Sequence, residues 1–432
     1  MQRRTLLIAA TTALAAPAFV RAQAIEKPKL TIAVGGKNLL YYLPLTIAET
    51  QGFFKAEGLD VTIADFAGGS QALRAVVGGS ADVVSGAFEH TLNMQSKGQA
   101  LRAFVLQGRA PQIVLGINPK TMPNFKSLAD LKGKKIGVTA PGSSTNVMAN
   151  FVLAKAGIKP SEVSIVGVGA GNGAVAAMRA GQIDAISNLD PVITLLQRSG
   201  DLKIISDTRI VAEADKVFGG PMPAACLYAP QSFIDKHPAT VQALANALVR
   251  ADKWIQGAGA GEIIKAVPEN YLLGDRAVYI DAFMAAKGAL SPDGLFPEAG
   301  AATAVRALQS IDPALKDTKF DLAAAYTNEF VRKANLKYPK GGVPPRCRCK
   351  GSAAPSSTAT IRRSAIPRCA TSRSPSAPAS SSAWSGRPAA ARARCSMSRP
   401  GCSNPAAARS RCSARRFRAS THVRATCSRP RA

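Results

Sequence analysis

From residue 28 to residue 230 the chain alternates short strand-like runs with helix-like stretches, and this alternation restricts the fold more than any other feature. The runs are apolar and rich in β-branched residues, and most precede a segment whose apolar side chains recur at helical spacing. Such an order is typical of parallel sheets with crossover helices. The expected strands are Leu30–Val34, Leu59–Phe66, Ala81–Ser85, Arg102–Leu106, Gln112–Ile117, Lys135–Thr139, Val163–Val168, Ile183–Ser187, Leu202–Ser206 and Ala224–Ala229.

Helices are expected between most of these strands, and after Ala229 the pattern becomes almost wholly helical. In the clearest case, Pro238–Gln256, the side chains of Val241, Leu244 and Leu248 fall near one helix face. We therefore expect an α/β protein with a helical C-terminal part. The expected helices are Pro44–Gln51, Ser70–Val77, Thr91–Lys97, Ser144–Ala156, Ala174–Ala180, Pro191–Gln197, Pro238–Gln256, Glu262–Val267, Ala277–Lys287, Ala301–Ile311 and Asp321–Ala334.

The segment Lys134–Ala154, KKIGVTAPGSSTNVMANFVLA, has the pattern of a strand, a glycine turn and the start of a helix. The first backbone N–H groups of a helix lack internal partners, and the helix dipole adds partial positive charge there. Together with the hydroxyls of Ser143, Ser144 and Thr145, these groups can form a cradle for a carboxylate, sulfonate, phosphate or nitrate. One of the serines can instead serve only as an N-cap, and the segment alone leaves both interpretations open.

Composition divides the chain near residue 340. Residues 341–432 hold 19 Lys and Arg, no Asp or Glu and seven of the eight cysteines, whereas residues 25–340 hold 33 basic and 27 acidic side chains. The basic excess belongs mainly to the tail, so the high net charge does not by itself indicate a nucleic-acid-binding protein. The tail is poor in large apolar residues and is expected to be disordered, because it cannot build a core.

The first 24 residues have the pattern of an export signal. Arg3 and Arg4 precede the apolar run 6–20, and residues 22–24, AQA, fit a small-x-small cleavage site. The run is too short and too rich in alanine for a membrane span. We expect export by the Sec or the twin-arginine route and a mature protein in the periplasm.

The tail can also be interpreted in another reading frame. If residues 384–398, WSGRPAAARARCSMS, are back-translated with freely chosen codons, the shifted frame can encode VVGPSGCGKSTLLNV, which holds the P-loop pattern GxxxxGKS. We interpret 341–432 as an out-of-frame reading of a neighbouring importer ATPase gene. The coding DNA tests this, because an intact P-loop must appear in the shifted frame.

Four motifs run in order through most of residues 28–340. They are LTIAVGGKNLLYYLPLTIAETQGFFKAEGLDVTI, GGSQALRAVVGGSADVVSGA, SLADLKGKKIGVTAPGSST and AAMRAGQIDAISNLDP. In these motifs the chain resembles the periplasmic solute-binding proteins of ABC importers for nitrate, sulfonates and taurine, a family that includes binders of thiamine-pyrimidine precursors. The resemblance implies an α/β, two-lobed periplasmic-binding-protein fold (type II, flytrap) that closes on its ligand.

The resemblance also implies boundaries and a role. One lobe would comprise residues 28–113 and 218–340 and the other 114–217, with hinges near Arg109–Gln112 and Val211–Gly220. The protein would capture a small anionic or organic solute of the nitrate, sulfonate or taurine class and deliver it to an ABC permease in the inner membrane. It is expected to be a monomer that uses no cofactor or metal, binds no nucleic acid and catalyses no reaction.

Carried over onto this sequence, the family pattern places ligand contacts in loops that follow strand ends. One of Tyr41 and Tyr42 is expected to face the cleft, because a tyrosine combines an apolar body with a polar tip. Asp190 is expected to cap a helix or serve the hinge, and the company of the other loops favours the anion role of Ser143–Thr145. The expected ligand-binding residues are Lys37, Asn38, Tyr41, Tyr42, Ser70, Gln71, Gly86, Ala87, Ser143, Ser144, Thr145, Asn188 and Asp190.

The sequence offers no arginine that can be placed on an anion. Lys37 and Arg109 are the nearest cations, and neutral hydroxyls with backbone N–H groups suit a monovalent anion better than a doubly charged one. The paired tyrosines would suit an organic ligand with a flat or apolar portion.

Other chemistries have weaker support. Gly169–Ala174 matches GxGxxA but lies in the middle of a domain, His90 and His237 are isolated, and Cys226 is expected to be buried. The alternative function is an enzyme or sensor on the same fold for a pyrimidine precursor. A nucleic-acid-binding function would depend on the tail alone.

Overall fold

The computed structural model describes residues 24–339 of the 432-residue chain. The expected export signal at the start, the expected disordered tail 341–432 and its proposed shifted frame lie outside the described residues. Within 24–339, no helix is both long and apolar enough to cross a membrane.

The first sheet has five strands in the order β2-β1-β3-β10-β4. Strand β1 is parallel to β2 and β3, with Ile32 opposite Ile63 and Val83, whereas β10 is antiparallel to β3 and β4. Every residue of β3 is buried, as expected for a central strand covered on both faces. The strands are β1 (Lys29–Gly35), β2 (Asp60–Phe66), β3 (Val83–Ala87), β4 (Leu101–Leu106) and β10 (Ala225–Pro230).

The second sheet repeats this arrangement with the order β7-β6-β8-β5-β9. Strand β6 is parallel to β7 and β8, with Ile136 opposite Ile165 and Ala185, whereas β5 is antiparallel to β8 and β9. The strands are β5 (Val114–Ile117), β6 (Lys135–Val138), β7 (Ser164–Gly167), β8 (Ala185–Asn188) and β9 (Lys203–Asp207).

Both sheets are mixed: the expectation of parallel strands holds for β1, β2 and β3 and for β6, β7 and β8, whereas β5 and β10 run antiparallel to their neighbours. All ten expected strands are present, each within two residues of its expected bounds. The antiparallel strands β5 and β10 are the ones that the chain enters after passing from one sheet to the other. The crossover rule that makes neighbouring strands parallel applies to strands joined by a helix within one sheet, and it does not govern these two.

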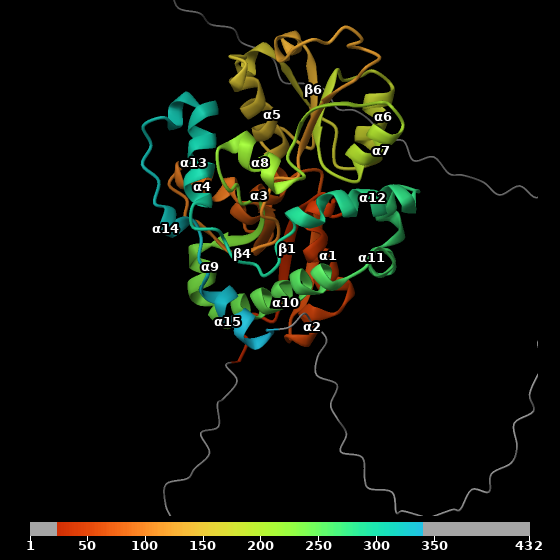
Figure 1. Ribbon diagram of the computed structural model, residues 1–432. Coiled ribbons are helices and arrows are strands. Elements are labelled where there is room, and N and C mark those ends of the chain that lie inside the picture. Colours follow the sequence, from red (N-terminus) through yellow and green to blue (C-terminus); the bar gives the residue numbers. More distant parts are fainter. Residues whose placement is uncertain (1–23, 340–432) are drawn as a thin grey trace, which may run out of the picture. The chain divides into compact units, whose positions relative to one another are not determined.

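Helices flank both sheets (Figure 1). The short 3-10 helix η1 (Leu40–Tyr42) follows β1. The α-helices are α1 (Leu43–Thr50), α2 (Phe53–Ala56), α3 (Gly69–Val77), α4 (Glu89–Gln95), α5 (Ser144–Lys155), α6 (Asn172–Arg179), α7 (Val192–Arg198), α8 (Val211–Phe218), α9 (Gln231–Lys236), α10 (Pro238–Gly257), α11 (Ala260–Ala266), α12 (Arg276–Ala286), α13 (Gly300–Ile311), α14 (Leu322–Ala325) and α15 (Glu329–Lys337).

The expected single helix Asp321–Ala334 is wrong, because the structure divides it into α14 and α15. Between them, the backbone N–H of Thr327 donates to the Ala103 carbonyl at 2.8 Å. The side chain of Asn328 accepts from the backbone N–H of Phe296 at 2.9 Å and donates to its carbonyl at 3.0 Å. These long-range hydrogen bonds hold the link in a non-helical conformation. The short helices α2, α8 and α9 were not expected.

The candidate site is described below in terms of two parts of the molecule, each built around one sheet. We call residues 24–106 and 225–339, which hold the first sheet, the first half, and residues 114–207, which hold the second sheet, the second half. Helices α12 and α13 of the first half reach the second half, where α12 packs against α7 and α13 against α5 (Figure 1). An ion pair at 3.1 Å between Arg198 of α7 and Asp281 of α12 adds to the first contact.

The chain passes between the halves twice, through residues 107–113 and 208–224. The backbone N–H of Gln112 donates to the Thr208 carbonyl at 3.1 Å, and the N–H of Thr208 donates to the Ile113 carbonyl at 3.1 Å. Thr208 therefore joins the two crossing segments. Val211–Gly220, the segment expected as the second hinge, lies within the second crossing and is largely helix α8.

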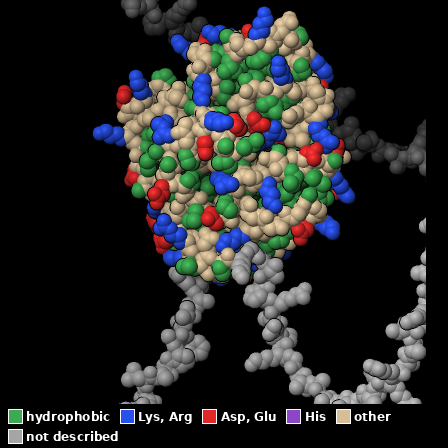
Figure 2. All heavy atoms as spheres, viewed as in Figure 1, with side chains coloured by type: hydrophobic (Ala, Val, Ile, Leu, Met, Phe, Trp, Pro, Cys, Tyr) green, Lys and Arg blue, Asp and Glu red, His purple; other side chains and the backbone are tan. Residues whose placement is uncertain are grey.

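The surface carries mixed charge. On the face shown in Figure 2, Lys and Arg side chains lie among Asp and Glu side chains and small apolar patches. Large exposed apolar side chains include Met284 on α12 and Leu336 on α15, and single side chains of this kind are normal on a protein surface.

Candidate functional site

A small cavity lies between the two halves, and we call it the interface cavity. Its volume is about 20 Å³, little more than one water molecule needs. The polar groups in its lining are the Tyr41 and Ser144 hydroxyls and the Glu89 carboxyl. The lining residues are Tyr41, Glu89, Pro111, Ile113, Ser144, Val147, Met148, Phe218, Met222, Pro223 and Ala224.

Ser143 joins the halves beside this cavity. It stands at the N-cap position of α5, but its side chain makes no cap hydrogen bond. Its Oγ accepts from the backbone N–H of Ser70 at 3.0 Å and donates to Ser70 Oγ at 3.2 Å. Ser70 Oγ in turn donates to the Pro141 carbonyl at 2.9 Å. In this conformation the expected cradle residue Ser143 holds the other half of the protein.

Two glycines allow the halves to approach this closely. A Cβ on Gly68 would lie 2.7 Å from the Cβ of Ala140 and 2.9 Å from Ser143 Oγ. A Cβ on Gly36 would lie 2.5 Å from the Cβ of Ala170. All three distances are shorter than real Cβ contacts, so the absence of a side chain at these two positions is required for the contact.

The loop after β1 makes a second contact between the halves. The side-chain amide of Asn38 donates to the Ala170 carbonyl at 2.9 Å. The backbone N–H of Leu40 donates to the Asp190 carbonyl at 3.0 Å. Asn38 therefore lies where the expectation placed it, between the halves, but its amide is bonded to protein.

Of the three cradle residues, Ser144 alone lines the cavity. Thr145 is buried, and its Oγ1 accepts from the Thr139 backbone N–H at 3.0 Å and lies 2.9 Å from Thr139 Oγ1. Its hydroxyl thus fastens the turn before α5. The structure brings Ser144 to the cavity and turns Thr145 inward.

The two adjacent tyrosines have different surroundings. Tyr41 lines the cavity, and Tyr42 is buried behind it with the two rings edge to face at 4.9 Å. Gly86 and Ala87 are buried in β3. A Cβ on Gly86 would lie 2.9 Å from the Tyr228 ring, so this strand packs against β10 and leaves no room for a ligand at Gly86.

Several expected contacts point away from the cavity. The Lys37 ammonium pairs with Glu49 at 2.7 Å. Gln71 is exposed, and its Oε1 accepts from the Ala67 backbone N–H at 3.3 Å. Arg109 donates from Nε to the Gly288 carbonyl at 2.9 Å. None of these side chains belongs to the lining, so the two cations nearest in sequence are engaged elsewhere.

Asn188 ends β8 and Asp190 follows it, and the side chains of both bind partners within the second half or the crossing segment that leaves it. The Asn188 amide donates to the Gly169 carbonyl at 3.1 Å. Asp190 accepts from the Thr194 backbone N–H at 2.9 Å and pairs with the Arg209 guanidinium at 3.3 Å. Burial raises the pKa of Asp190 although the nearby Arg209 opposes the shift. Neither residue lines the cavity.

Glu89 is the one polar residue of the lining that the sequence reasoning missed. It is the first residue of α4, separated from buried β3 by Phe88, and it is 4 % exposed. Burial raises the pKa of the Glu89 carboxyl to about 7. The sequence gives no local signal for this role, because Glu89 lies four residues after the expected strand Ala81–Ser85 and its carboxyl is unusual only through its burial.

His90, next to Glu89, has a structural role. Its Nδ1 lies 3.0 Å from the Tyr228 hydroxyl, and its Nε2 is buried without a partner among the described residues. Burial lowers the pKa of His90 to about 4. The imidazole is therefore neutral at physiological pH, and it does not line the cavity.

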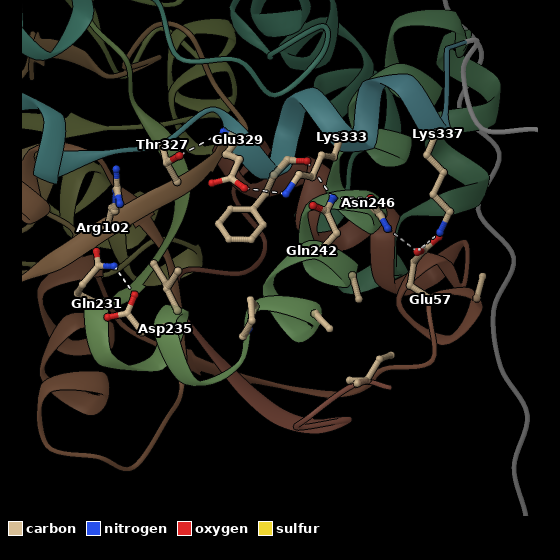
Figure 3. A pocket seen from close by; sticks show the side chains of 17 residues that line it. Glu57, Arg102, Gln231, Asp235, Gln242, Asn246, Thr327, Glu329, Lys333 and Lys337 are labelled. Carbon is tan, nitrogen blue, oxygen red and sulfur yellow. Dashed lines mark hydrogen bonds and ion pairs between the residues drawn. The ribbon is translucent and has the colours of Figure 1, made fainter. Parts of the chain in front are cut away.

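A larger pocket, of about 740 Å³, lies on the first half alone (Figure 3). Four of its charged groups form ion pairs: Glu57 pairs with Lys337 at 2.8 Å and also accepts from the Asn246 amide at 2.8 Å, and Lys333 pairs with Glu329 at 2.7 Å. The second half contributes no residue to its lining. None of the expected ligand-binding residues lines this pocket, whereas Tyr41 and Ser144 line the interface cavity, which is therefore the better candidate site.

Metal chemistry has no candidate in the part of the chain that the structure describes. No group of three or more His, Cys, Asp or Glu side chains there could hold an ion. Cys226, the one cysteine among residues 24–339, is buried in β10.

A family model described as NMT1/THI5 like matches residues 40–257. A solved structure from Bordetella bronchiseptica RB50 is 65% identical, covers 74% of this chain and 100% of its own, and superposes with a TM-score of 0.73. The alkanesulfonate-binding protein SsuA from Xanthomonas axonopodis pv. citri, bound to MOPS, has 20% identity, coverage of 71% and 100%, and a TM-score of 0.53. The periplasmic nitrate-binding protein NrtA from Synechocystis PCC 6803 has 16% identity, coverage of 73% and 90%, and a TM-score of 0.59.

These similarities show that the chain has the periplasmic-binding-protein fold, which confirms the fold class inferred from the sequence. Sequence relatives are more distant. YtlA of Bacillus subtilis (strain 168) is 22% identical over 54% of this chain and 68% of its own. The 4-amino-5-hydroxymethyl-2-methylpyrimidine phosphate synthase of Schizosaccharomyces pombe is 25% identical over 33% of this chain, and the match spans only 40% of the synthase.

Proposed function

The chain belongs to the NMT1/THI5-like family and has a periplasmic-binding-protein fold, and from that premise we propose that it captures a small solute between its two halves without transforming it. The observation that carries this proposal is the interface cavity, which both halves line. Hydrogen bonds at Ser70–Ser143 and Asn38–Ala170 also join the two halves. A ligand held there would contact both halves and so stabilise their closed arrangement.

The cavity is too small for such a solute in this conformation. Ligand entry therefore needs the halves to separate, with residues 107–113 and 208–224 as the hinge segments. We propose residues 28–113 with 218–340 and residues 114–217 as the two moving lobes. The contacts between the lobes include hydrogen bonds, the ion pair of Arg198 with Asp281 and two helix contacts, and polar interfaces of this kind between domains permit relative motion.

The expected solute class was nitrate, a sulfonate or taurine. Nitrate- and sulfonate-binding proteins share the fold, but at this level of identity the likeness concerns the fold alone. Taurine and organic solutes fit better than nitrate, because the cavity lining offers apolar side chains and a carboxyl beside only two hydroxyls. We further propose that the protein is a monomer in the periplasm and delivers its solute to an ABC permease in the inner membrane.

A thermal-shift screen of the full chain tests the proposal, using nitrate, propanesulfonate, taurine, benzoate and 4-aminopyrimidine. A solute that binds only the native state raises the melting temperature with concentration. The bound solute should be recovered chemically unchanged by mass spectrometry after the protein is denatured. If no solute of any class raises the melting temperature and titration calorimetry detects no binding, the proposal is wrong.

The second candidate is an enzyme on this fold, because the family includes a pyrimidine phosphate synthase. The same recovery experiment distinguishes the two, since an enzyme would return a product of different mass. Replacing Glu89, the titratable carboxyl in the cavity, would then abolish turnover. A binding protein would lose only affinity.

A further inference from the structure

The interface cavity contains a carboxyl group and no cationic side chain. Among residues 24–339, no Lys, Arg or His lines it, and Glu89 forms no ion pair within that range. Lys37 and Arg109, the cations that could have faced an anion, are held by Glu49 and the Gly288 carbonyl. A bare anion entering this cavity would meet the buried carboxylate without a compensating charge.

Four ionisable side chains in the neighbourhood of Glu89 are electrically neutral near pH 7. Tyr41 and Tyr42 reach it from the loop after β1, and Cys226 and Tyr228 from β10, close enough for its charge to help raise their pKa values. The neighbouring His90 stays neutral because burial lowers its pKa. Glu89 is thus a buried carboxyl without a cationic partner among the described residues, a costly arrangement unless something else supplies one.

We propose that Glu89 determines the specificity of the site, and that the ligand is a small organic solute presenting cationic or neutral N–H donors, such as an amidine, an amine or an amino-substituted heterocycle, to this carboxyl. The inference rests on the proposed solute-binding function. The hydroxyls of Tyr41 and Ser144 can bond further polar atoms of the same ligand. The resulting hydrogen bonds to a carboxylate are of the strong, charge-assisted kind.

The rest of the lining fits the body of such a ligand. Val147, Met148, Phe218 and Met222 surround the space with apolar side chains. Methionine side chains are flexible and polarizable, so they can repack around a flat or branched group when the halves part and close again. A charged head on Glu89 and an apolar body against these residues would fix the orientation of the ligand.

The test measures dissociation constants of the full chain by titration calorimetry for benzamidine, methylguanidine, 4-aminopyrimidine, taurine, propanesulfonate and nitrate. Wild type should bind at least one of the first four at least 100-fold more tightly than propanesulfonate or nitrate. Glu89→Gln should weaken that ligand about 10- to 100-fold, because a charged hydrogen bond is lost. The matched control Glu269→Gln, whose carboxylate is exposed and pairs with Arg276, should change nothing.

The relative affinities of these ligands also show whether the N–H donor that Glu89 prefers is cationic or neutral. Retained binding of methylguanidine and benzamidine with weak 4-aminopyrimidine indicates a cation, and the reverse order indicates a neutral heterocycle. The inference is overturned if an anion binds best, or if Glu89→Gln leaves the affinity of the best N–H donor unchanged while the variant keeps the wild-type melting temperature. Binding of an anion alone would leave the proposed function intact, whereas binding of no solute would overturn both.

Discussion

Ser143 Oγ accepts a hydrogen bond from the backbone N–H of Ser70 at 3.0 Å, across the boundary between the two halves. The two residues are 73 positions apart in the sequence, and both are buried in this conformation. The N–H of Ser70 lies at the beginning of α3, where it has no partner within its own helix. The Ser143 hydroxyl therefore accepts the hydrogen bond of the Ser70 N–H in this arrangement. Water could accept that hydrogen bond only if the halves separated.

Replacing Ser143 with alanine should favour the open arrangement. In the closed arrangement the Ser70 N–H would be buried without an acceptor, at a cost of about 1–3 kcal/mol, whereas the open one loses little. A smaller closed fraction raises the apparent dissociation constant for any ligand of the closed state, about 5- to 100-fold. Calorimetric titration of Ser143→Ala with the best solute measures this.

The matched control is Ser310→Ala, because Ser310 Oγ bonds only the Ala307 carbonyl of its own helix. It should bind like wild type. An unchanged affinity in Ser143→Ala, at wild-type melting temperature, would show that this hydrogen bond does not contribute to closure.

A methyl group at position 68 should hold the halves apart. The backbone of Gly68 is extended, with φ −169° and ψ 164°, so alanine is acceptable there in the isolated half. Its Cβ would meet Ala140 and Ser143 at 2.7–2.9 Å. Gly68→Ala should therefore lower ligand affinity at least tenfold with little loss of stability, and small-angle X-ray scattering with saturating ligand should show a larger radius of gyration than wild type.

Gly261→Ala is the control, because a Cβ at that helical position meets nothing within 4 Å. It should leave affinity and scattering unchanged and stabilise the helix slightly. Equal radii of gyration for ligand-saturated Gly68→Ala and wild type would contradict the proposal that the halves close through this contact.

Local pattern was sufficient to predict the strands but not the site. The strands β1 to β10 are predicted correctly because their apolar runs would be unstable in any arrangement other than a strand. The directions of β5 and β10 are not predicted, because they depend on how the chain returns between the halves. Ser143 was identified as a residue of interest from its place before α5, but its partner Ser70 belongs to another motif far along the chain. Glu89 escaped notice because the significance of a carboxyl depends on its three-dimensional neighbours.

The buried Glu89 should make stability depend on pH. Its pKa is raised in the folded protein to about 7, so between the unfolded value near 4.5 and 7 the folded state binds more protons. The stabilising contribution is complete below the unfolded pKa and is lost as pH rises through 7. Glu89→Gln, which cannot ionise, should therefore raise the free energy of unfolding at pH 8 by about 2–3 kcal/mol and change it little at pH 4.5.

Urea denaturation at the two pH values checks this expectation. Glu269→Gln, with its exposed side chain, should shift neither. A loss of stability at pH 8 in Glu89→Gln would mean that the ionised carboxyl is stabilised in the folded protein, contrary to its raised pKa.

Binding of a permanently cationic ligand should strengthen with pH. A carboxylate attracts the cation, and below a pKa of about 7 Glu89 is protonated in the free protein. Benzamidine stays protonated throughout this range, so its dissociation constant should be about tenfold higher at pH 6 than at pH 8. The same titration with Glu89→Gln should be independent of pH, and a flat profile for wild type would exclude the carboxyl from the contact.

Arg209 should be essential for the stability of the second half. Its guanidinium is buried with Asp190 at 3.3 Å and bonds Asp207 at 2.6 Å. Arg209→Ala would leave the Asp190 carboxylate buried without its cation, which costs about 3–5 kcal/mol of unfolding free energy at pH 7. The exposed pair of Arg276 and Glu269 provides the control, because Arg276→Ala should cost less than about 1 kcal/mol.

In the double variant Asp190→Asn with Arg209→Ala, the loss of unfolding free energy should be smaller than the sum of the single losses. Strictly additive losses in urea denaturation would show that the two side chains are not coupled.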